Sequence, residues 1–267
     1  MSHQTDPEFL VQQEYDEATA LKLRNQIQLR YRSQRESWFQ WVFARLHLPP
    51  ECRILELGCG SADLWQENHD HIPPGWWVTL TDLSPGMLGA ARENRPHSHD
   101  FRLAQVNAQA LPFPEEIFHG VLAIGLLDHL PDRRTAFNEI RRVLKPGGKF
   151  YAATGGRLHL QEIEALLRPF LSEADLGGDP HRFGLENGAQ LLSPWFCQVH
   201  LERYEDELVF RSPDPIIAYA LSEAQVSRLL QDKRRKAFVE YVRQELARRG
   251  ELRVRNNKGL FEATKED

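Results

Sequence analysis

Apolar segments of strand length alternate with helical stretches through the middle of this chain. The segments expected to form strands are residues 53–57, 76–80, 101–106, 121–124 and 149–154. Residues 121–124 are continuously apolar, as expected of a strand that is covered on both faces. Strands that alternate with helices predict a mostly parallel α/β sheet with helices on both sides.

Helix signals fill the intervals between these strands. A helix is expected to begin near Ala62, and Ser84-Pro85 has the form of an N-cap followed by proline, opening a helix that runs to about Asn94. Residues 134–144 place their apolar side chains on one stripe, and the Pro-Gly-Gly at 146–148 ends that helix. A further helix is expected at about 159–171.

The two segments that flank this alternating region are expected to be mostly helical. Residues from about 8 to 48 are expected to be helical up to Pro49-Pro50, and residues 215–249 close the chain with further helices. Residues 197–204 and 207–211 look like two strands that form an antiparallel edge. We therefore divide the chain into an N-terminal helical segment (1–50), an α/β core (51–211) and a C-terminal helical extension (212–267).

Composition narrows the class of protein. The chain has 267 residues and a formal net charge of -5, which argues against a dedicated nucleic-acid binder. The many Lys and Arg residues of the C-terminal helices are therefore interpreted as a solvated face. No apolar run is long enough to cross a membrane, and the first ten residues lack the apolar stretch of a signal peptide. Three scattered cysteines suit neither a disulfide framework nor a metal site, so we expect a cytoplasmic protein with no metal.

Candidate binding residues follow the first strand. In a doubly wound sheet, ligands bind at the carboxyl ends of the strands, near the reversal of strand order. Gly58 and Gly60 allow a tight turn there, and the acidic Glu56 suits an amino group better than a phosphate. A dinucleotide fingerprint requires glycine where Asp63 stands, which weakens a nicotinamide-cofactor interpretation.

Two polar residues follow the second and third strands. Asp82 is placed to accept hydrogen bonds from a ribose diol; the alternative is an acid that favours the N-terminus of the next helix. The Asn107 amide is able to bond an adenine edge, and it is equally able to cap a turn.

Five short sequence motifs follow one another in an order that is typical of one enzyme family. They are ILELGCG at 54–60, TDLSPGML at 81–88, NAQALPF at 107–113, LDHLPD at 127–132 and RVLKPGGKF at 142–150. The chain thereby resembles the class I S-adenosyl-L-methionine (SAM)-dependent methyltransferases over residues 53–154. It is most similar to the small-molecule group that includes the ubiquinone and menaquinone biosynthesis enzymes. The resemblance implies a Rossmann-like sheet with an antiparallel last strand.

The same resemblance implies roles in holding SAM and its product, S-adenosyl-L-homocysteine (SAH). The turn with Glu56, Gly58, Cys59 and Gly60 would hold the methionine part of SAM. The segment Ile124–Leu127 would line the arm of that part. Asp82 would bind the ribose, Leu83 and Met87 would pack against adenine, and Asn107 with Ala108 would meet its edge. The family often has glycine where Ala62 stands and usually aspartate where Asn107 stands, and an asparagine there is still able to accept from the adenine amine and to donate to a ring nitrogen.

Residues near the expected acceptor side complete the candidate site. His129 is a candidate general base or a structural loop histidine, and Asp128 either orients it or caps the following turn. Tyr15 and Tyr31 are candidates for covering the cofactor, because the family carries a tyrosine-containing N-terminal helix as a lid. The aromatic residues between Trp38 and Trp41 are able to wall a pocket, but core packing is expected for at least two of them.

The sequence thus predicts a SAM-dependent methyltransferase that moves a methyl group to an O, N, C or S atom of a small-molecule acceptor by in-line displacement. Two other classes stay open: a SAM-binding regulatory protein without turnover, and a nicotinamide-dependent oxidoreductase. No nucleic-acid partner and no membrane insertion are expected. The acceptor, the pathway and the oligomeric state are left open.

Overall fold

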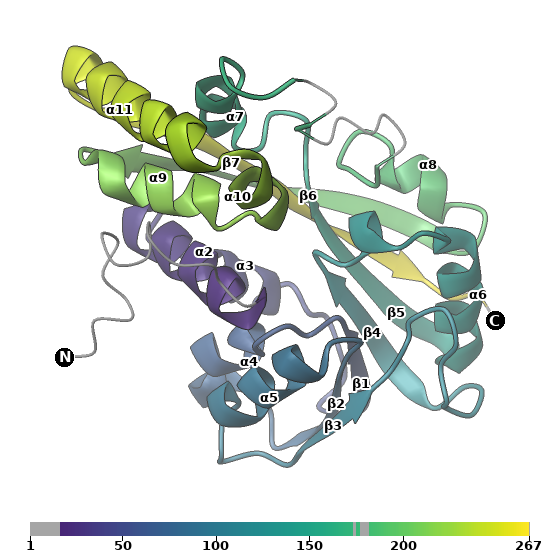
Figure 1. Cartoon of the computed structure of the whole chain (residues 1–267). Coiled ribbons are helices and arrows are strands. Elements are labelled where there is room, and N and C mark those ends of the chain that lie inside the picture. Colours follow the sequence, from purple (N-terminus) through teal and green to yellow (C-terminus); the bar gives the residue numbers. More distant parts are fainter. Residues whose placement is uncertain (1–16, 173–174, 177–181, 267) are drawn as a thin grey trace. The chain divides into compact units, whose positions relative to one another are not determined.

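A seven-stranded sheet organises the chain (Figure 1). The computed structural model describes residues 17–172, 175–176 and 182–266. The strands are β1 (Glu51–Leu57), β2 (Gly75–Asp82), β3 (Phe101–Gln105), β4 (Phe118–Ile124), β5 (Leu144–Gly155), β6 (Cys197–Phe210) and β7 (Leu252–Thr264). Their order is β3-β2-β1-β4-β5-β7-β6. β1 to β5 pair in parallel and β7 pairs antiparallel to β5, which confirms the Rossmann-like fold with one antiparallel strand.

The strand order reverses between β1 and β4, which lie side by side in the sheet. The chain leaves β1 in one direction to build β2 and β3, and then returns to the other side of β1 to build β4 and β5. At such a reversal the loops after the two central strands diverge and leave a crevice for a ligand. The turns after β1 and β4 are therefore the place to look for a site.

The helices between the strands of the parallel half follow in the order expected from the sequence. The described helices are α2 (Glu17–Tyr31), α3 (Trp38–Phe43), α4 (Asp63–Glu67), α5 (Pro85–Asn94), α6 (Arg133–Val143), α7 (Gln161–Leu167), α8 (Gly188–Leu192), α9 (Pro213–Leu221), α10 (Ala224–Leu229) and α11 (Asp232–Arg249). Of these, α8 was not expected. The expected N-cap of α5 is present, because the Ser84 hydroxyl accepts a hydrogen bond from Met87 N. None of the described helices combines the length and apolar character needed to cross a bilayer.

Both faces of the parallel strands are buried. On β1, Leu55 and Leu57 join a cluster with Phe137 and Ile140 of α6, whereas Ile54 joins a second cluster on the other face. That second cluster contains Trp65 of α4 and residues of α3 and α5, and the same alternation recurs along β4 and β5. Burial on both faces explains why these strands read as nearly continuous apolar runs.

The sequence interpretation was wrong about the last two strands. The segments 197–204 and 207–211 form one strand, β6, and the C-terminal extension ends in β7 rather than in helix. Asp206 does not make a turn, because its carboxylate accepts hydrogen bonds from Ser33 and Gln34 while the strand continues past it. In β7 the buried Leu252 and Val254 alternate with exposed arginines, so the segment reads as polar although one face is buried.

The N-terminal helical segment is also divided differently. Instead of one helix up to Leu48, the described part contains α2 and α3, which are separated between Tyr31 and Trp38. Ser37 caps α3 through a capping box with Gln40, which gives the second helix its own start.

The chain forms two compact units, each built from separate stretches. Of the described residues, unit 1 comprises 17–35, 158–172, 175–176 and 205–256, and unit 2 comprises 36–157, 182–204 and 257–266. The chain passes from one unit to the other within β6 and within β7. The boundaries drawn from sequence, at 50/51 and 211/212, stay a prediction about functional segments.

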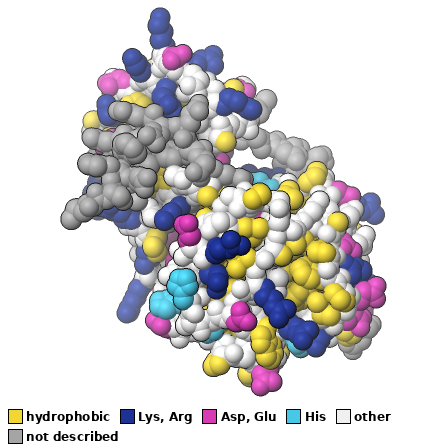
Figure 2. All heavy atoms as spheres, turned by 60° about the horizontal axis from the view of Figure 1, so that its bottom comes forward, with side chains coloured by type: hydrophobic (Ala, Val, Ile, Leu, Met, Phe, Trp, Pro, Cys, Tyr) yellow, Lys and Arg dark blue, Asp and Glu magenta, His cyan; other side chains and the backbone are white. Residues whose placement is uncertain are grey.

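Charged side chains of both signs occupy the surface. On the face shown in Figure 2, Lys and Arg side chains are interspersed with Asp and Glu and with hydrophobic side chains. The exposed large hydrophobic residues among the described ones are Leu29, Trp77, Leu83 and Leu158.

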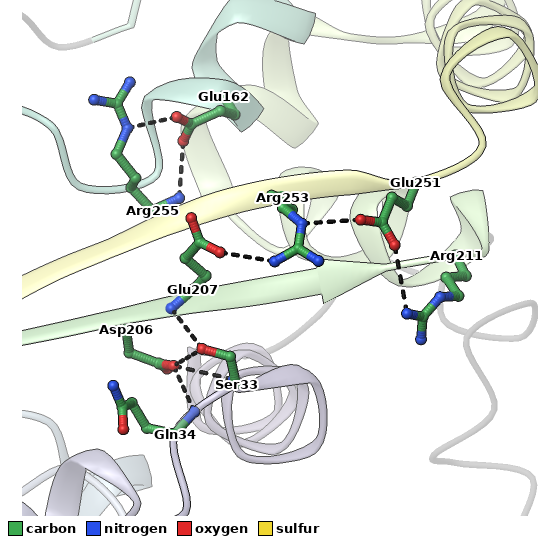
Figure 3. A network of polar contacts seen from close by, with 9 residues as sticks. All are labelled: Ser33, Gln34, Glu162, Asp206, Glu207, Arg211, Glu251, Arg253 and Arg255. Carbon is green, nitrogen blue, oxygen red and sulfur yellow. Dashed lines mark hydrogen bonds and ion pairs between the residues drawn. The ribbon is translucent and has the colours of Figure 1, made fainter.

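Unit 1 carries a chain of ion pairs along β6 and β7 (Figure 3). Arg253 lies between two carboxylates, 3.1 Å from Glu207 and 2.9 Å from Glu251, and Glu251 also lies 3.4 Å from Arg211. These side chains are largely exposed, so each pair contributes little to stability on its own. The apolar core of unit 1 lies among α2, α7 and the helices α9 to α11.

Candidate functional site

The turn after β1 has a backbone that requires glycine. Gly58 and Gly60 adopt φ angles of +64° and +53°, in the left-handed region that other residues avoid. A Cβ on Gly58 would lie 2.9 Å from Leu126 Cδ1, so the turn also packs closely against the segment after β4. Cys59 N donates to Thr81 O at 2.9 Å, which ties the turn to the end of β2.

Ala62 ends this turn and begins α4. Its φ is +60° and it is fully buried. Alanine is tolerated at this left-handed position at a cost of about 1–2 kcal/mol relative to glycine. This backbone conformation explains why glycine suits the position in the family that the chain resembles.

Asp82 links the turn to the next helix. Its Oδ2 accepts a hydrogen bond from Gly60 N at 3.0 Å, and its Oδ1 accepts one from Ser84 N at 2.9 Å. Both interpretations of Asp82 from sequence are thus compatible with its place at the end of β2. The half-buried carboxylate ties the turn after β1 to the start of α5, and its ribose role stays a prediction.

Glu56 is a buried carboxyl group at the end of β1. It is 3% exposed, and its Oε2 accepts a hydrogen bond from the Trp65 indole Nε1–H at 2.5 Å. Burial raises the pKa of Glu56 to about 8, the hydrogen bond from Trp65 opposes that rise, and the carboxylates of Asp63 and Asp82 add to it. Burial also raises the pKa of the Cys59 thiol, which is therefore neutral at physiological pH.

The predicted adenine contacts lie beyond β2 and β3. Leu83 is 64% exposed, whereas Met87 is buried in the first turn of α5. Asn107 is exposed and its Oδ1 accepts a hydrogen bond from Gln109 N at 2.9 Å, while Ala108 is buried. The turn-capping alternative for Asn107 is therefore present, and its contact with adenine stays a prediction.

The segment after β4 places the remaining candidates. Ile124 ends β4, and Gly125 follows with a φ of +78° and donates its N–H to Ala153 O at 3.0 Å. Asp128 and His129 lie in a single turn of 3-10 helix, Leu127–His129. This places them after the strand that neighbours β1, as the sequence predicted.

Asp128 is held by a residue that the sequence did not single out. Its side chain is 8% exposed, and its Oδ2 accepts hydrogen bonds from both Nε, at 2.9 Å, and Nη2 of Arg182. The structure shows no hydrogen bond between Asp128 and the exposed ring of His129, and Asp132 is the residue that caps α6. Neither role first considered for Asp128 is therefore seen; it anchors the turn that carries His129.

The N-terminal aromatic residues fall into three groups. Tyr15 lies outside the described residues. Tyr31 belongs to unit 1, where its ring lies 4.8 Å from that of Phe210, so its role over the cofactor stays a prediction. In unit 2, Trp41 is buried, and Trp38 and Phe39 pack partly against the same core, which confirms core packing for at least two of these residues.

Two residues that shape this site were not among the candidates from sequence, Trp65 and Arg182. Trp65 is visible in the sequence only as an aromatic residue of the helix after the turn, and its bond to Glu56 depends on how α4 packs. Leu126 lies in the segment 124–127 that was expected to line the cofactor, but its close packing against Gly58 was not predicted. Arg182 lies 54 positions from Asp128, so no local pattern indicates the pair.

Comparisons with known proteins agree with this geometry. Residues 55–152 match a family described as a methyltransferase domain. A demethylmenaquinone methyltransferase from Symbiobacterium thermophilum is 34% identical over 118 residues, covering 43% of this chain and 47% of that protein. A ubiquinone/menaquinone biosynthesis C-methyltransferase from Xanthomonas campestris pv. campestris is 33% identical over 116 residues, covering 42% and 46%.

A solved structure shares the fold over nearly the whole chain. Phosphoethanolamine N-methyltransferase 2 of Haemonchus contortus, in complex with SAM, has a TM-score of 0.59 at 19% identity, covering 98% of this chain and 60% of that one. The chain spans about half the length of the curated relatives it matches. Together these comparisons show that the chain resembles the class I SAM-dependent methyltransferases, in the group of the ubiquinone and menaquinone biosynthesis enzymes, through its domain at residues 55–152.

Proposed function

We propose that this protein is a SAM-dependent methyltransferase that acts on a small-molecule acceptor. The observation that carries the proposal is the turn Gly58–Gly60, which Asp82 holds at the reversal of strand order beside the buried carboxyl of Glu56. A backbone that approaches closely, with a buried acid beside it, suits a ligand with an amino group. The family match of residues 55–152 supports the same choice.

The residues present fit this cofactor. Oε2 of Glu56 is engaged by Trp65, while no described residue donates a hydrogen bond to Oε1, which is therefore available for the ammonium group of the methionine part. Gly58, Gly60 and Ile124 would enclose that part, with Cys59 in the turn. Asp82 would accept from the ribose, and Leu83, Met87, Asn107 and Ala108 would surround the adenine.

SAM supplies an activated methyl group on a sulfonium when bound. The chain's own residues then have to hold the acceptor in line with it and exclude water, which lowers the barrier by removing freedom of orientation. His129 would take a proton from an acceptor that carries one, and the ion pair of Asp128 with Arg182 holds the turn on which it lies. The methylated atom is an O, N, C or S of the acceptor.

The acidic surroundings argue against a nicotinamide cofactor. Asp63 opens α4, where a pyrophosphate would need to approach the helix N-terminus, and Glu56 lies behind it. A small-molecule acceptor is favoured over a nucleic acid by the net charge of -5 and by the mixed charges of the surface in Figure 2. A cytoplasmic location belongs to the same proposal and agrees with three free cysteines.

Thermal unfolding with SAM, SAH, NAD and NADP in parallel tests the cofactor. A ligand at about 100 times its dissociation constant adds roughly 2.7 kcal/mol of stability, or roughly 5–10 °C for a chain of this size. We expect a shift with SAM and SAH alone, and a shift only with NAD or NADP would contradict the proposal. Methyl transfer from labelled SAM to candidate acceptors then separates an enzyme from a SAM-binding protein without turnover.

Calorimetry of two variants tests the binding residues. Asp82→Ala is expected to lose most of the SAH affinity. Asp132→Ala is the matched control, because Asp132 likewise accepts from two backbone N–H groups at a helix start but lies outside the turn after β1. Equal SAH affinity in Asp82→Ala and the unchanged protein would contradict the ribose assignment.

A further inference from the structure

The carboxyl of Glu56 has an environment that is unfavourable to its charge. It is 3% exposed, and the charged groups that face it are the carboxylates of Asp63 on α4 and Asp82 at the end of β2. The thiol of Cys59, in the turn between them, is neutral. A buried acid that faces two other acids keeps its proton unless a cation or a strong hydrogen-bond donor compensates the charge.

Trp65 provides the one donor that the described residues offer to this group. Its indole is fully buried, and its ring meets those of Phe43, Trp76 and Phe101 at centroid distances between 5.6 and 6.4 Å. The three edge-on contacts fix the direction of the Nε1–H, which points at Oε2 of Glu56 at 2.5 Å. The carboxyl is thereby held in one rotamer with Oε1 left for another partner.

We propose that Trp65 is a positioning residue that holds Glu56 so that the ammonium group of SAM or SAH replaces a proton on the buried carboxyl. The inference rests on the proposed function. Without SAM or SAH, the Glu56 carboxyl is protonated and therefore neutral. When the cofactor binds, the ammonium keeps its own protons, the carboxyl O–H bond breaks, and one proton leaves to solvent, so that a carboxylate faces an ammonium.

Because cofactor binding displaces a proton from Glu56, the affinity for SAH depends on pH. The pKa of Glu56 in the empty site is raised to about 8, so near pH 7 most molecules carry the proton that binding must displace. SAH affinity is therefore expected to rise about tenfold per pH unit between pH 6 and 7 and to level off above pH 8. Asp63 and Asp82 share the site, but neither is buried as deeply as Glu56.

Calorimetric titration of SAH at pH 7, in buffers of different ionisation enthalpy, measures the proton directly. We expect about one proton released per SAH bound. 5′-Methylthioadenosine lacks the amino-acid part and is expected to bind without releasing a proton. Glu56→Gln is expected to abolish the release with SAH.

Trp65→Phe tests the positioning role, since it keeps an aromatic ring in the core and removes the N–H donor; the accompanying loss of ring volume is matched by the control below. Without the donor the carboxylate is harder to form, so SAH affinity at pH 7 is expected to fall about tenfold or more, with 5′-methylthioadenosine affinity unchanged. Trp76→Phe is the matched control, because Trp76 is a buried indole of the same cluster whose Nε1 donates to Pro49 O at 2.9 Å. It is expected to leave the pH dependence of SAH binding as it was.

The outcomes separate this inference from the proposed function. If SAH and 5′-methylthioadenosine both bind and SAH releases no proton, the inference is overturned while the proposed function stands. If Trp65→Phe and Trp76→Phe weaken both ligands equally, Trp65 is merely a core residue. If the unchanged protein binds neither SAM nor SAH, the proposed function fails and the inference with it.

Discussion

Replacing Gly58 by alanine is the sharpest test of the turn after β1. Two costs add at this position. The φ of +64° places alanine in the left-handed region, at about 1–2 kcal/mol. The new Cβ would lie 2.9 Å from Leu126 Cδ1 and 3.3 Å from both Cβ and Cγ of Leu126, so turning the end of the leucine away does not relieve the contact. Crowding of this kind costs about 1–3 kcal/mol.

Gly58→Ala is therefore expected to destabilise unit 2 by about 2–5 kcal/mol, or roughly 5–15 °C in melting temperature. The control is Gly89→Ala on α5, where no atom lies within 4 Å of the new Cβ. The same chemical change there is expected to be neutral or to stabilise by up to about 1 kcal/mol, because alanine favours helix. Scanning calorimetry is suitable, because the transition that SAH shifts identifies the unit that holds the site.

A second substitution separates the two costs. Leu126→Ala removes the contacts with Cδ1 and Cγ, keeps the one with Cβ at 3.3 Å, and leaves the backbone angle at position 58 unchanged. The double variant Gly58→Ala/Leu126→Ala is expected to be more stable than the sum of the single effects by about 1–2 kcal/mol, within the range seen for residues in contact. Strict additivity, or a Gly58→Ala protein as stable as Gly89→Ala, would refute the idea that the turn is packed against the segment after β4.

Three further predictions concern the charged groups of unit 2. Hydrogen bonds from Arg142 hold the pKa of Glu139 below its usual 4.5, so the stability that this pair contributes is present above pH 4.5 and is lost as the pH falls through the lowered pKa. Unfolding curves should therefore show Glu139→Gln approaching the unchanged protein in stability between pH 5 and 3. A stability difference that stays constant over this range would contradict the prediction. His129→Ala should lower the rate of methyl transfer more than SAH affinity, and an equal loss of both would mean that His129 is structural. Arg182→Gln should release the Asp128 turn, lowering turnover about tenfold with SAH affinity nearly unchanged, which parallel kinetics and calorimetry would check.

The parallel half of the sheet was predictable because its signals are local. β1 and β4 are largely buried on both faces, so each reads as an apolar run, and β2 reads as one too although Trp77 is exposed. Glycine at positions 58 and 60 predicts a turn with left-handed backbone angles from the residue type alone. The helix start at Ser84 was visible for the same reason, since the N-cap and the following proline are adjacent in sequence.

β7 was not predictable in the same way. Arg253 and Arg255 interrupt its apolar residues, and Asn256 at the next inward position is a buried polar residue. What makes the segment a strand is its place between β5 and β6, with register partners from Lys149 to Gly155 that lie about 110 positions earlier. Pairing over such a separation leaves no mark in a short window of sequence.

At the site, too, the sequence gives the residue types but not their surroundings. The sequence identifies three acids around the turn, Glu56, Asp63 and Asp82, and acids there favour a cationic ligand over a phosphate. It does not tell which of them is charged, because that depends on burial, and burial depends on how α4 and its tryptophan pack on the sheet. Asp82 is half-buried and accepts hydrogen bonds from two backbone N–H groups, whereas Glu56 is enclosed with one donor and faces other acids, so burial favours its neutral form until a cation arrives. The pH dependence proposed for cofactor binding therefore rests on the burial of Glu56, which no sequence pattern shows.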